Sequence, residues 1–181
     1  MSSTRQQSVL VELSIAGDRL AFDALYRRWY ARWYQFAVRH TDNPDIASDV
    51  IQDAALAMVK GIRRLRDPDT FVAWSFIILR RSCANVVRRA VQDRRNERLA
   101  PVDAPQAITT VTDPRLADLA EMVNCLDRDQ QNLLTLFYGY GLSVRELAAI
   151  YDVPSGTIKS RLSKLREQIR SRVTHSQEDG V

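Results

Sequence analysis

The sequence predicts an all-α protein made of two small helical domains joined by a flexible linker, the C-terminal domain containing a helix-turn-helix. Apolar residues recur at steps of three and four positions in several separate stretches, and no stretch alternates apolar and polar residues as a strand does. The 181 residues include only six glycines and six prolines. Three of the prolines, Pro101, Pro105 and Pro114, interrupt a segment that has no helical pattern.

The first half of the chain contains three amphipathic patterns, which predict three helices around one core in residues 1–98. One pattern runs from Asp18 to His40, with the predicted inward residues Phe22, Leu25, Trp29, Trp33 and Phe36. The next begins at Asp45, with the predicted inward residues Ile46, Val50, Ala54, Met58, Ile62 and Leu65. The last follows the Asp-Pro-Asp-Thr segment at 67–70 and carries Phe71, Trp74, Ile77 and Ile78 before it becomes basic.

The proline-bearing segment 99–114 is the predicted linker, and residues 115–181 form the predicted second domain. Helical periodicity resumes there with Leu116, Leu119, Val123 and Leu126. Further helices are expected at 130–138, 143–151 and from 155 to about 173.

Charge is distributed unevenly along the chain. Lys and Arg number 26 and Asp and Glu 22, a formal net charge of +4, which permits an anionic partner without requiring one. The segment from Thr41 to Asp53 carries four Asp and no cation, whereas Arg80 to Arg98 carries seven Arg against two acidic residues. The first predicted domain therefore combines an acidic helix face with a basic helix.

Several classes of function lack their sequence signals. His40 and His175 are isolated, no glycine-rich phosphate loop occurs, and the cysteines Cys83 and Cys125 lack the paired spacing of a zinc site. Both cysteines are expected to be small core residues of a protein in a reducing compartment. No apolar stretch approaches the roughly 20 residues of a membrane span. We expect a cytoplasmic protein that is not an enzyme, has no stable membrane insertion, and needs no cofactor or metal.

The most specific local pattern lies between residues 143 and 166. Ser143 and Glu146 have the spacing of a capping box, with Leu147 and Ala148 facing inward. The Asp-Val-Pro triplet at 152–154 breaks this helix, and Ser155 is placed to cap the next one. Helix, short turn and helix at this spacing predict a helix-turn-helix, in which Ile158, Leu162 and Leu165 pack inward.

The outward positions of its second helix carry groups suited to the major groove of DNA. Arg and Lys donate hydrogen bonds to guanine acceptors or phosphates, and hydroxyls reach either bases or backbone. The segment from Pro154 to Thr174 contains six Lys or Arg residues and a single Glu. An ordinary solvated helix face is the alternative interpretation of such a charge run. The predicted DNA-binding residues are Thr157, Lys159, Ser160, Arg161, Ser163 and Lys164.

The segment PSGTIKSRLSKLR at 154–166 resembles the recognition helix of region 4 in extracytoplasmic-function (ECF) sigma factors of the sigma-70 family. The segment LDRDQQNLLTLF at 126–137 resembles the opening helices of that region, with Asp127 and Asp129 in place of the usual prolines or small residues. The resemblance implies that this domain reads the upstream −35 promoter element and docks on the β flap of RNA polymerase.

The segments AFDALYRRWY at 21–30 and DVIQD at 49–53 independently resemble region 2 of the same family. The resemblance implies that Asp49, Gln52 and Asp53 bind the β′ clamp of core RNA polymerase. Asp49 and Asp53 are four residues apart, so they lie on one helix face and can pair with arginines of the clamp. A solvated acidic face is the alternative interpretation.

The segments 67–70 and 71–89 correspond in that family to the parts that capture and melt the −10 element. Melted DNA requires cations along its backbone and stacking surfaces for its bases. Phe71 and Trp74 are candidates for stacking, although the spacing of Trp74 favours the core. The family often has Asn at the position of Arg81 and a polar or basic residue at that of Ile77. The predicted −10-binding residues are Arg80, Arg81, Asn85, Arg88 and Arg89.

The resemblance thus predicts a sigma factor whose partners are core RNA polymerase, promoter DNA and an anti-sigma factor. One alternative is a sigma-like decoy that occupies an anti-sigma factor through protein contacts alone. Another is a helix-turn-helix regulator that binds DNA without polymerase, against which the acidic face of Asp49, Gln52 and Asp53 argues.

Overall fold

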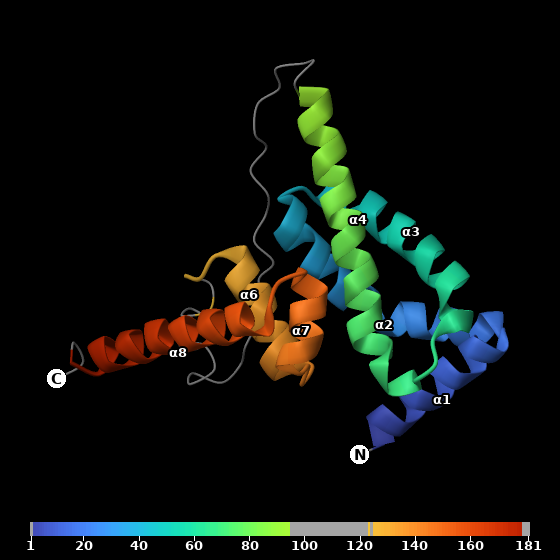
Figure 1. The fold of residues 1–181 in the computed structure, drawn as a ribbon, viewed down its shortest axis with the longest axis horizontal. Helices are drawn as coiled ribbons and strands as arrows, with labels where there is room; N and C mark the ends of the chain where they lie inside the picture. Colours follow the sequence, from blue (N-terminus) through green and yellow to red (C-terminus); the bar gives the residue numbers. More distant parts are fainter. Residues whose placement is uncertain (1, 95–122, 124, 179–181) are drawn as a thin grey trace. The chain divides into compact units, whose positions relative to one another are not determined.

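The computed structural model describes residues 2–94, 123 and 125–178, and this part of the chain consists of helices, turns and loops with no strand. The predicted all-α class is confirmed. The chain divides into two compact units, Met1–Pro105 and Gln106–Val181, and the division falls within the predicted linker 99–114, which itself lies outside the described residues. The two units are described separately below (Figure 1).

Unit 1 is a bundle in which the long second helix packs against the other three. Two short 3-10 turns join the third helix to the fourth. In chain order the elements are α1 (Ser2–Ala16), α2 (Arg19–Thr41), α3 (Pro44–Gly61), η1 (Ile62–Arg64), η2 (Pro68–Thr70) and α4 (Phe71–Arg94).

Local capping signals set the helix boundaries of unit 1. Asp18 caps α2 by accepting hydrogen bonds from the amides of Leu20 and Ala21 at 2.8 and 3.2 Å. Asn43 caps α3 in the same way, and Pro44 occupies the first turn, where its missing N–H costs nothing.

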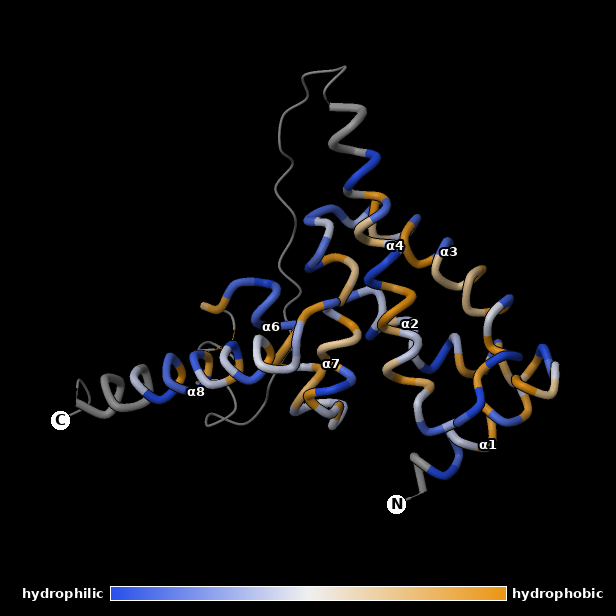
Figure 2. Tube along the Cα trace, in the orientation of Figure 1, coloured by the Kyte–Doolittle hydropathy of each residue, from blue (hydrophilic) through white to orange (hydrophobic). Residues whose placement is uncertain are grey.

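An aromatic cluster forms the centre of the unit 1 core. Trp29, Trp33 and Phe36 of α2 meet Phe71 and Phe76 of α4, with ring centroids 5.1 to 6.4 Å apart. Apolar residues recur in short blocks along each helix, as expected for one buried face per helix (Figure 2). Burial of such large rings contributes strongly to the hydrophobic stabilisation of this unit.

The predicted inward faces of α2 and α3 are correct except at Phe22, Ile46 and Leu65, which are half-buried, and the predicted face of α4 is partly wrong. Phe71 is fully buried as expected, but Trp74, Ile77 and Ile78 are only half-buried. The buried positions of α4 are instead Ala73, Ser75, Phe76, Leu79 and Cys83. The contacts of the Phe76 ring with α2 turn this face inward, which periodicity within α4 alone does not fix.

The N-terminal residues form a fourth helix that the sequence analysis did not anticipate. Its inner face buries Val11 and Ser14, and the Ser14 hydroxyl donates to the Leu10 carbonyl at 2.7 Å. The helix ends in a Schellman motif, since the amides of Gly17 and Asp18 donate to the carbonyls of Ser14 and Leu13 at 3.1 and 2.9 Å. The helix was not predicted because its apolar pattern is short and its first residues are polar.

Unit 2 comprises α6 (Arg128–Leu134), the π-helical turn η3 (Thr135–Gly139), α7 (Val144–Tyr151) and α8 (Ser155–Glu178). Asp127 forms a capping box with Gln130 at the start of α6, with its carboxylate accepting from the Gln130 amide at 2.8 Å. The Asp that departs from the family pattern at 127 therefore has a capping role. The core of the unit is apolar and includes Leu126, Leu133, Leu136, Leu147, Ile150, Ile158, Leu162 and Leu165.

The two cysteines differ in environment. Cys83 is 2% exposed in the unit 1 core, and burial raises the pKa of its thiol to about 12. Cys125 is exposed, so the expectation that it is a core residue is wrong. Among the described residues, no helix is long and apolar enough to cross a membrane, and no group of His, Cys, Asp and Glu has the arrangement of a metal site.

Candidate functional site

The helix-turn-helix of unit 2 has the predicted capping box, turn and second helix, and differs from the prediction at the start of that helix. The Ser143 hydroxyl accepts from the Glu146 amide at 3.3 Å, and the Glu146 carboxylate accepts from the Ser143 amide at 2.7 Å. Asp152 ends α7 in the left-handed conformation, with φ 53° and ψ 50°. This single residue produces the sharp turn between α7 and α8, because it redirects the backbone while an Asp side chain tolerates a positive φ.

The second helix begins one residue earlier than the predicted cap implies. Ser155 is the first residue of α8 rather than its cap, and the Pro154 carbonyl accepts from the amides of Thr157 and Ile158 at 2.9 and 3.4 Å. The inward residues Ile158, Leu162 and Leu165 are 0 to 2% exposed, which confirms the predicted core face of α8.

Five of the six predicted DNA-binding side chains lie exposed on the opposite side of α8. They are Lys159, Ser160, Arg161, Ser163 and Lys164. Thr157 is half-buried, because it lies at the boundary with the core face, and its carbonyl accepts from the Ser160 hydroxyl at 3.0 Å. The exposed surface of α8 is therefore basic and rich in hydroxyl groups.

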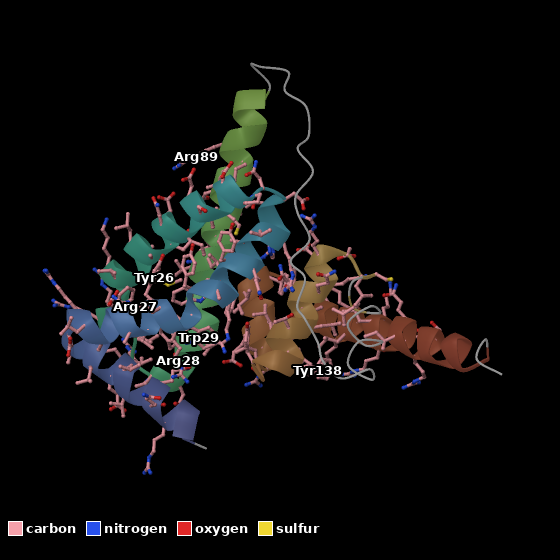
Figure 3. The ribbon with its side chains drawn as sticks, turned by 180° about the vertical axis from the view of Figure 1, so that it is seen from behind. Tyr26, Arg27, Arg28, Trp29, Arg89 and Tyr138 are labelled. Carbon is pink, nitrogen blue, oxygen red and sulfur yellow. The ribbon has the colours of Figure 1, made fainter. Side chains whose placement is uncertain are left out.

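A polar contact that the sequence analysis missed fixes α8 to η3. The Arg166 Nε atom donates to the Tyr138 hydroxyl at 2.9 Å, and the Arg166 guanidinium lies 5.9 Å from the centroid of the Phe137 ring. Figure 3 labels Tyr138 in this unit. Arg166 is thereby engaged in positioning the helix, and the adjacent aromatic pair at 137 and 138 is the only sequence signal for this contact.

The predicted polymerase-binding side chains Asp49, Gln52 and Asp53 are all exposed on α3. They lie on the side opposite the buried residues Val50, Ala54 and Met58. Leu56 and Val59 share this outer side and are 60% and 52% exposed. The sequence analysis missed these two apolar residues, although the helical period places them beside Gln52 and Asp53. We call these five residues the α3 outer face.

Four of the five predicted −10-binding residues form a stripe on α4. Arg81, Asn85, Arg88 and Arg89 are exposed, and their spacing of four, three and one residues places them on one helix face. Figure 3 shows Arg89 projecting from α4. Three cations and one amide on a single face can follow a phosphate backbone and donate to a base edge.

Arg80 differs from these four because it is half-buried and contacts α2. Its Nη1 atom donates to His40 Nε2 at 2.9 Å, while His40 Nδ1 lies 3.1 Å from the Phe36 carbonyl oxygen. A carbonyl only accepts hydrogen bonds, so Nδ1 carries the proton and Nε2 accepts from the guanidinium. The neutral His40 therefore holds Arg80 against α2, and the contact of Arg80 with the −10 element stays a prediction.

The two candidate stacking residues, Phe71 and Trp74, differ in exposure. Phe71 is fully buried, so its ring is not available to an unstacked base. Trp74 is half-buried, and its ring lies against the backbone of Gly61, where a Cβ atom would be 3.1 Å from the ring. Among the described aromatic residues of α4, Trp74 is thus the one with partial exposure.

Comparison with known proteins relates both units to one family. Residues 25–94 match the family described as Sigma-70 region 2, and residues 116–169 match the family described as Sigma-70, region 4. The chain is 28% identical to the ECF RNA polymerase sigma-E factor of Escherichia coli strain K12, over 96% of this chain and 97% of that protein. It is 25% identical to the protein of the same name in Haemophilus influenzae, over 96% of this chain and 98% of that protein.

Two solved structures share the fold. One is the sigma factor RpoE in complex with the anti-sigma factor NepR from Bartonella quintana, with a TM-score of 0.65, 23% identity, and coverage of 84% of this chain and 96% of that one. The other is CnrH in complex with the cytosolic domain of CnrY, with a TM-score of 0.58, 21% identity, and coverage of 94% and 98%.

Proposed function

The chain belongs to the sigma-70 family as an ECF-type factor, and we propose that it binds core RNA polymerase and directs it to particular promoters through three separate surfaces. The observation that carries the proposal is the coexistence of an acidic and apolar surface on α3 with basic surfaces on α4 and α8, each outside the two cores. A protein that binds DNA alone has no need of the α3 outer face.

The α3 outer face is our proposed binding site for the β′ clamp of core polymerase. Asp49 and Asp53 supply carboxylates for charge-assisted hydrogen bonds, and Gln52 supplies an amide beside them. Leu56 and Val59 add an exposed apolar area of the kind that forms the dry centre of a protein interface. Carboxylates beside an exposed apolar pair fit a partner surface that carries arginines next to an apolar area.

The α4 stripe and the outer surface of α8 are our proposed promoter contacts. Arg81, Asn85, Arg88 and Arg89 are assigned to the −10 element, with Arg80 positioned behind them through His40. The exposed residues of α8 are assigned to the −35 element, because the second helix of a helix-turn-helix enters the major groove. We also propose that unit 2 docks on the β flap.

Other parts of the assignment follow from this role. The phosphodiester chemistry belongs to the polymerase, so we assign no catalytic residue to this chain. We place the protein in the cytoplasm, because the polymerase and its template are there. An anti-sigma factor is a proposed partner, since a sigma factor of related fold has been solved as a complex with such a protein.

The decisive experiment adds the full chain to purified core polymerase and maps initiation sites across a genomic DNA pool. We expect initiation at a discrete set of promoters, none of which is used by core polymerase alone. The double variant Arg161→Ala with Lys164→Ala serves as a control for promoter recognition. Both side chains are exposed, so the variant should fold, and it should initiate less at the same promoters because both residues are proposed −35 contacts. Binding to core without any new initiation site would refute the proposal and favour the decoy.

A further inference from the structure

The N-terminal helix α1 contacts the loop between α3 and α4 at several points. Residues 62–70, which include η1 and η2, form this loop, and we call it the 62–70 loop. Helix α1 packs against both η1 and η2 as well as against α2. The Ser8 hydroxyl of α1 donates to the Asp69 carboxylate at 3.5 Å. The matched region 2 segment begins only at residue 25, so α1 lies outside it.

A further contact lies just after the end of α1. Gly17 has φ +102°, a conformation that favours glycine, and a Cβ atom at this position would lie 2.6 Å from Nη2 and 3.3 Å from Cζ of Arg63. The Arg63 guanidinium therefore covers the Gly17 backbone. No side chain other than hydrogen at position 17 leaves this space for Arg63.

The junction that carries Gly17 is rigid on both sides. The Schellman motif closes α1, and Asp18 caps α2 one residue later. Val11 is fully buried on the inner face of the helix. Helix α1 consequently has a fixed orientation relative to α2, and its contacts with the 62–70 loop are made from a fixed support.

We propose that α1 is a positioning element that holds the 62–70 loop in place and thereby contributes to selection among −10 sequences. This inference rests on the proposed function. The loop joins α3, which carries the proposed polymerase site, to α4, which carries the proposed −10 stripe. A binding surface must be held within about 0.5 Å of its productive geometry, and α1 gives the nine-residue loop beside the −10 stripe a support beyond its own two ends.

The test measures initiation by polymerase carrying the full chain over a promoter library with a randomised −10 element. Val11→Ala loosens the buried face of α1, and Val9→Ala is the matched control, because Val9 is 50% exposed on the same helix. We expect Val11→Ala to lower the ratio of initiation at preferred over non-preferred −10 sequences by about five-fold or more, the lower range of one base contact. Val9→Ala should leave the ratio unchanged, and both variants should keep −35 preference and core binding.

A double-mutant cycle keeps the proposal testable even where loosening α1 affects folding. Ser8→Ala and Asp69→Ala each remove the same hydrogen bond between α1 and the 62–70 loop, and Asp69 is exposed, so its loss should not disturb the core. If the contact positions the loop, the double variant should have the same −10 selectivity as either single variant. Additive effects, or wild-type selectivity in Val11→Ala and both single variants, would overturn the proposal. A wild-type chain that initiates nowhere would instead overturn the proposed function.

Discussion

Charge reversal on the α3 outer face, by Asp49→Arg together with Asp53→Arg, is expected to abolish binding to core polymerase without unfolding the chain. Both side chains are exposed, and neither caps a helix nor touches the buried face of α3. Substitutions at such positions usually change the free energy of unfolding by less than about 0.5 kcal/mol.

The expected loss of affinity follows from the two carboxylates involved. Each charge-assisted hydrogen bond contributes about 1.5 to 3 kcal/mol, so loss of both weakens binding by about 3 to 6 kcal/mol, or about 10²- to 10⁴-fold. Repulsion between the new arginines and cations of the clamp adds to this loss. The effect should decrease at high salt, because the electrostatic part of the interaction is screened.

The assay is a titration of labelled chain with core polymerase at two salt concentrations, with circular dichroism to establish helical content. Each reversal adds two positive charges, so the formal net charge rises from +4 to +8. The control Glu12→Arg with Asp23→Arg makes the same change in net charge at exposed positions of α1 and α2. It breaks only a surface ion pair between Asp23 and Arg27, which contributes about 0 to 1 kcal/mol. A correctly folded Asp49/Asp53 double variant that binds core polymerase as tightly as the control would refute the clamp assignment.

Three further predictions concern other parts of the chain. Arg161→Ala and Lys164→Ala should each weaken binding to the −35 element by about 1 to 3 kcal/mol. Loss of a phosphate contact reduces the dependence of DNA affinity on salt concentration, whereas loss of a base contact changes which DNA sequences are preferred. Unchanged affinity and unchanged preference in both variants would argue that α8 does not read the groove. Cys83, whose pKa is raised to about 12, should resist alkylation at pH 8 while Cys125 reacts, and mass spectrometry that finds Cys83 labelled in the folded chain would contradict this prediction. The contribution of the Cys83 thiol to stability should be complete below pH 9 and decline towards pH 12, because the unfolded chain loses the thiol proton first. A fragment of residues 115–181 should fold alone, as a cooperative thermal transition monitored by circular dichroism would establish, and a fragment without helical signal would contradict the domain division.

Local signals explain why much of the candidate site was predictable. The capping box of Ser143 and Glu146, the break at Asp152 and the inward stripe of α8 lie within a few residues of one another, and each acts through the backbone nearby. The same holds for the α3 outer face, where a helical period of 3.6 residues is enough to place Asp49 and Asp53 together and on the side away from the buried Met58. Leu56 and Val59 were within reach of the same reasoning.

The sequence by itself determined the helical class, the positions of most helices, the helix-turn-helix and the exposed sides of α3 and α8, because these depend on periodicity and on capping over short distances. Tertiary structure alone decided that Arg80 pairs with His40, 40 residues away, that Phe76 rather than Ile77 faces the core, and that α1 contacts the 62–70 loop at Arg63. In these cases the role of a side chain depends on which other helix packs against it, and that choice is made by the burial of aromatic and apolar faces across the whole unit rather than by neighbouring residues in the chain.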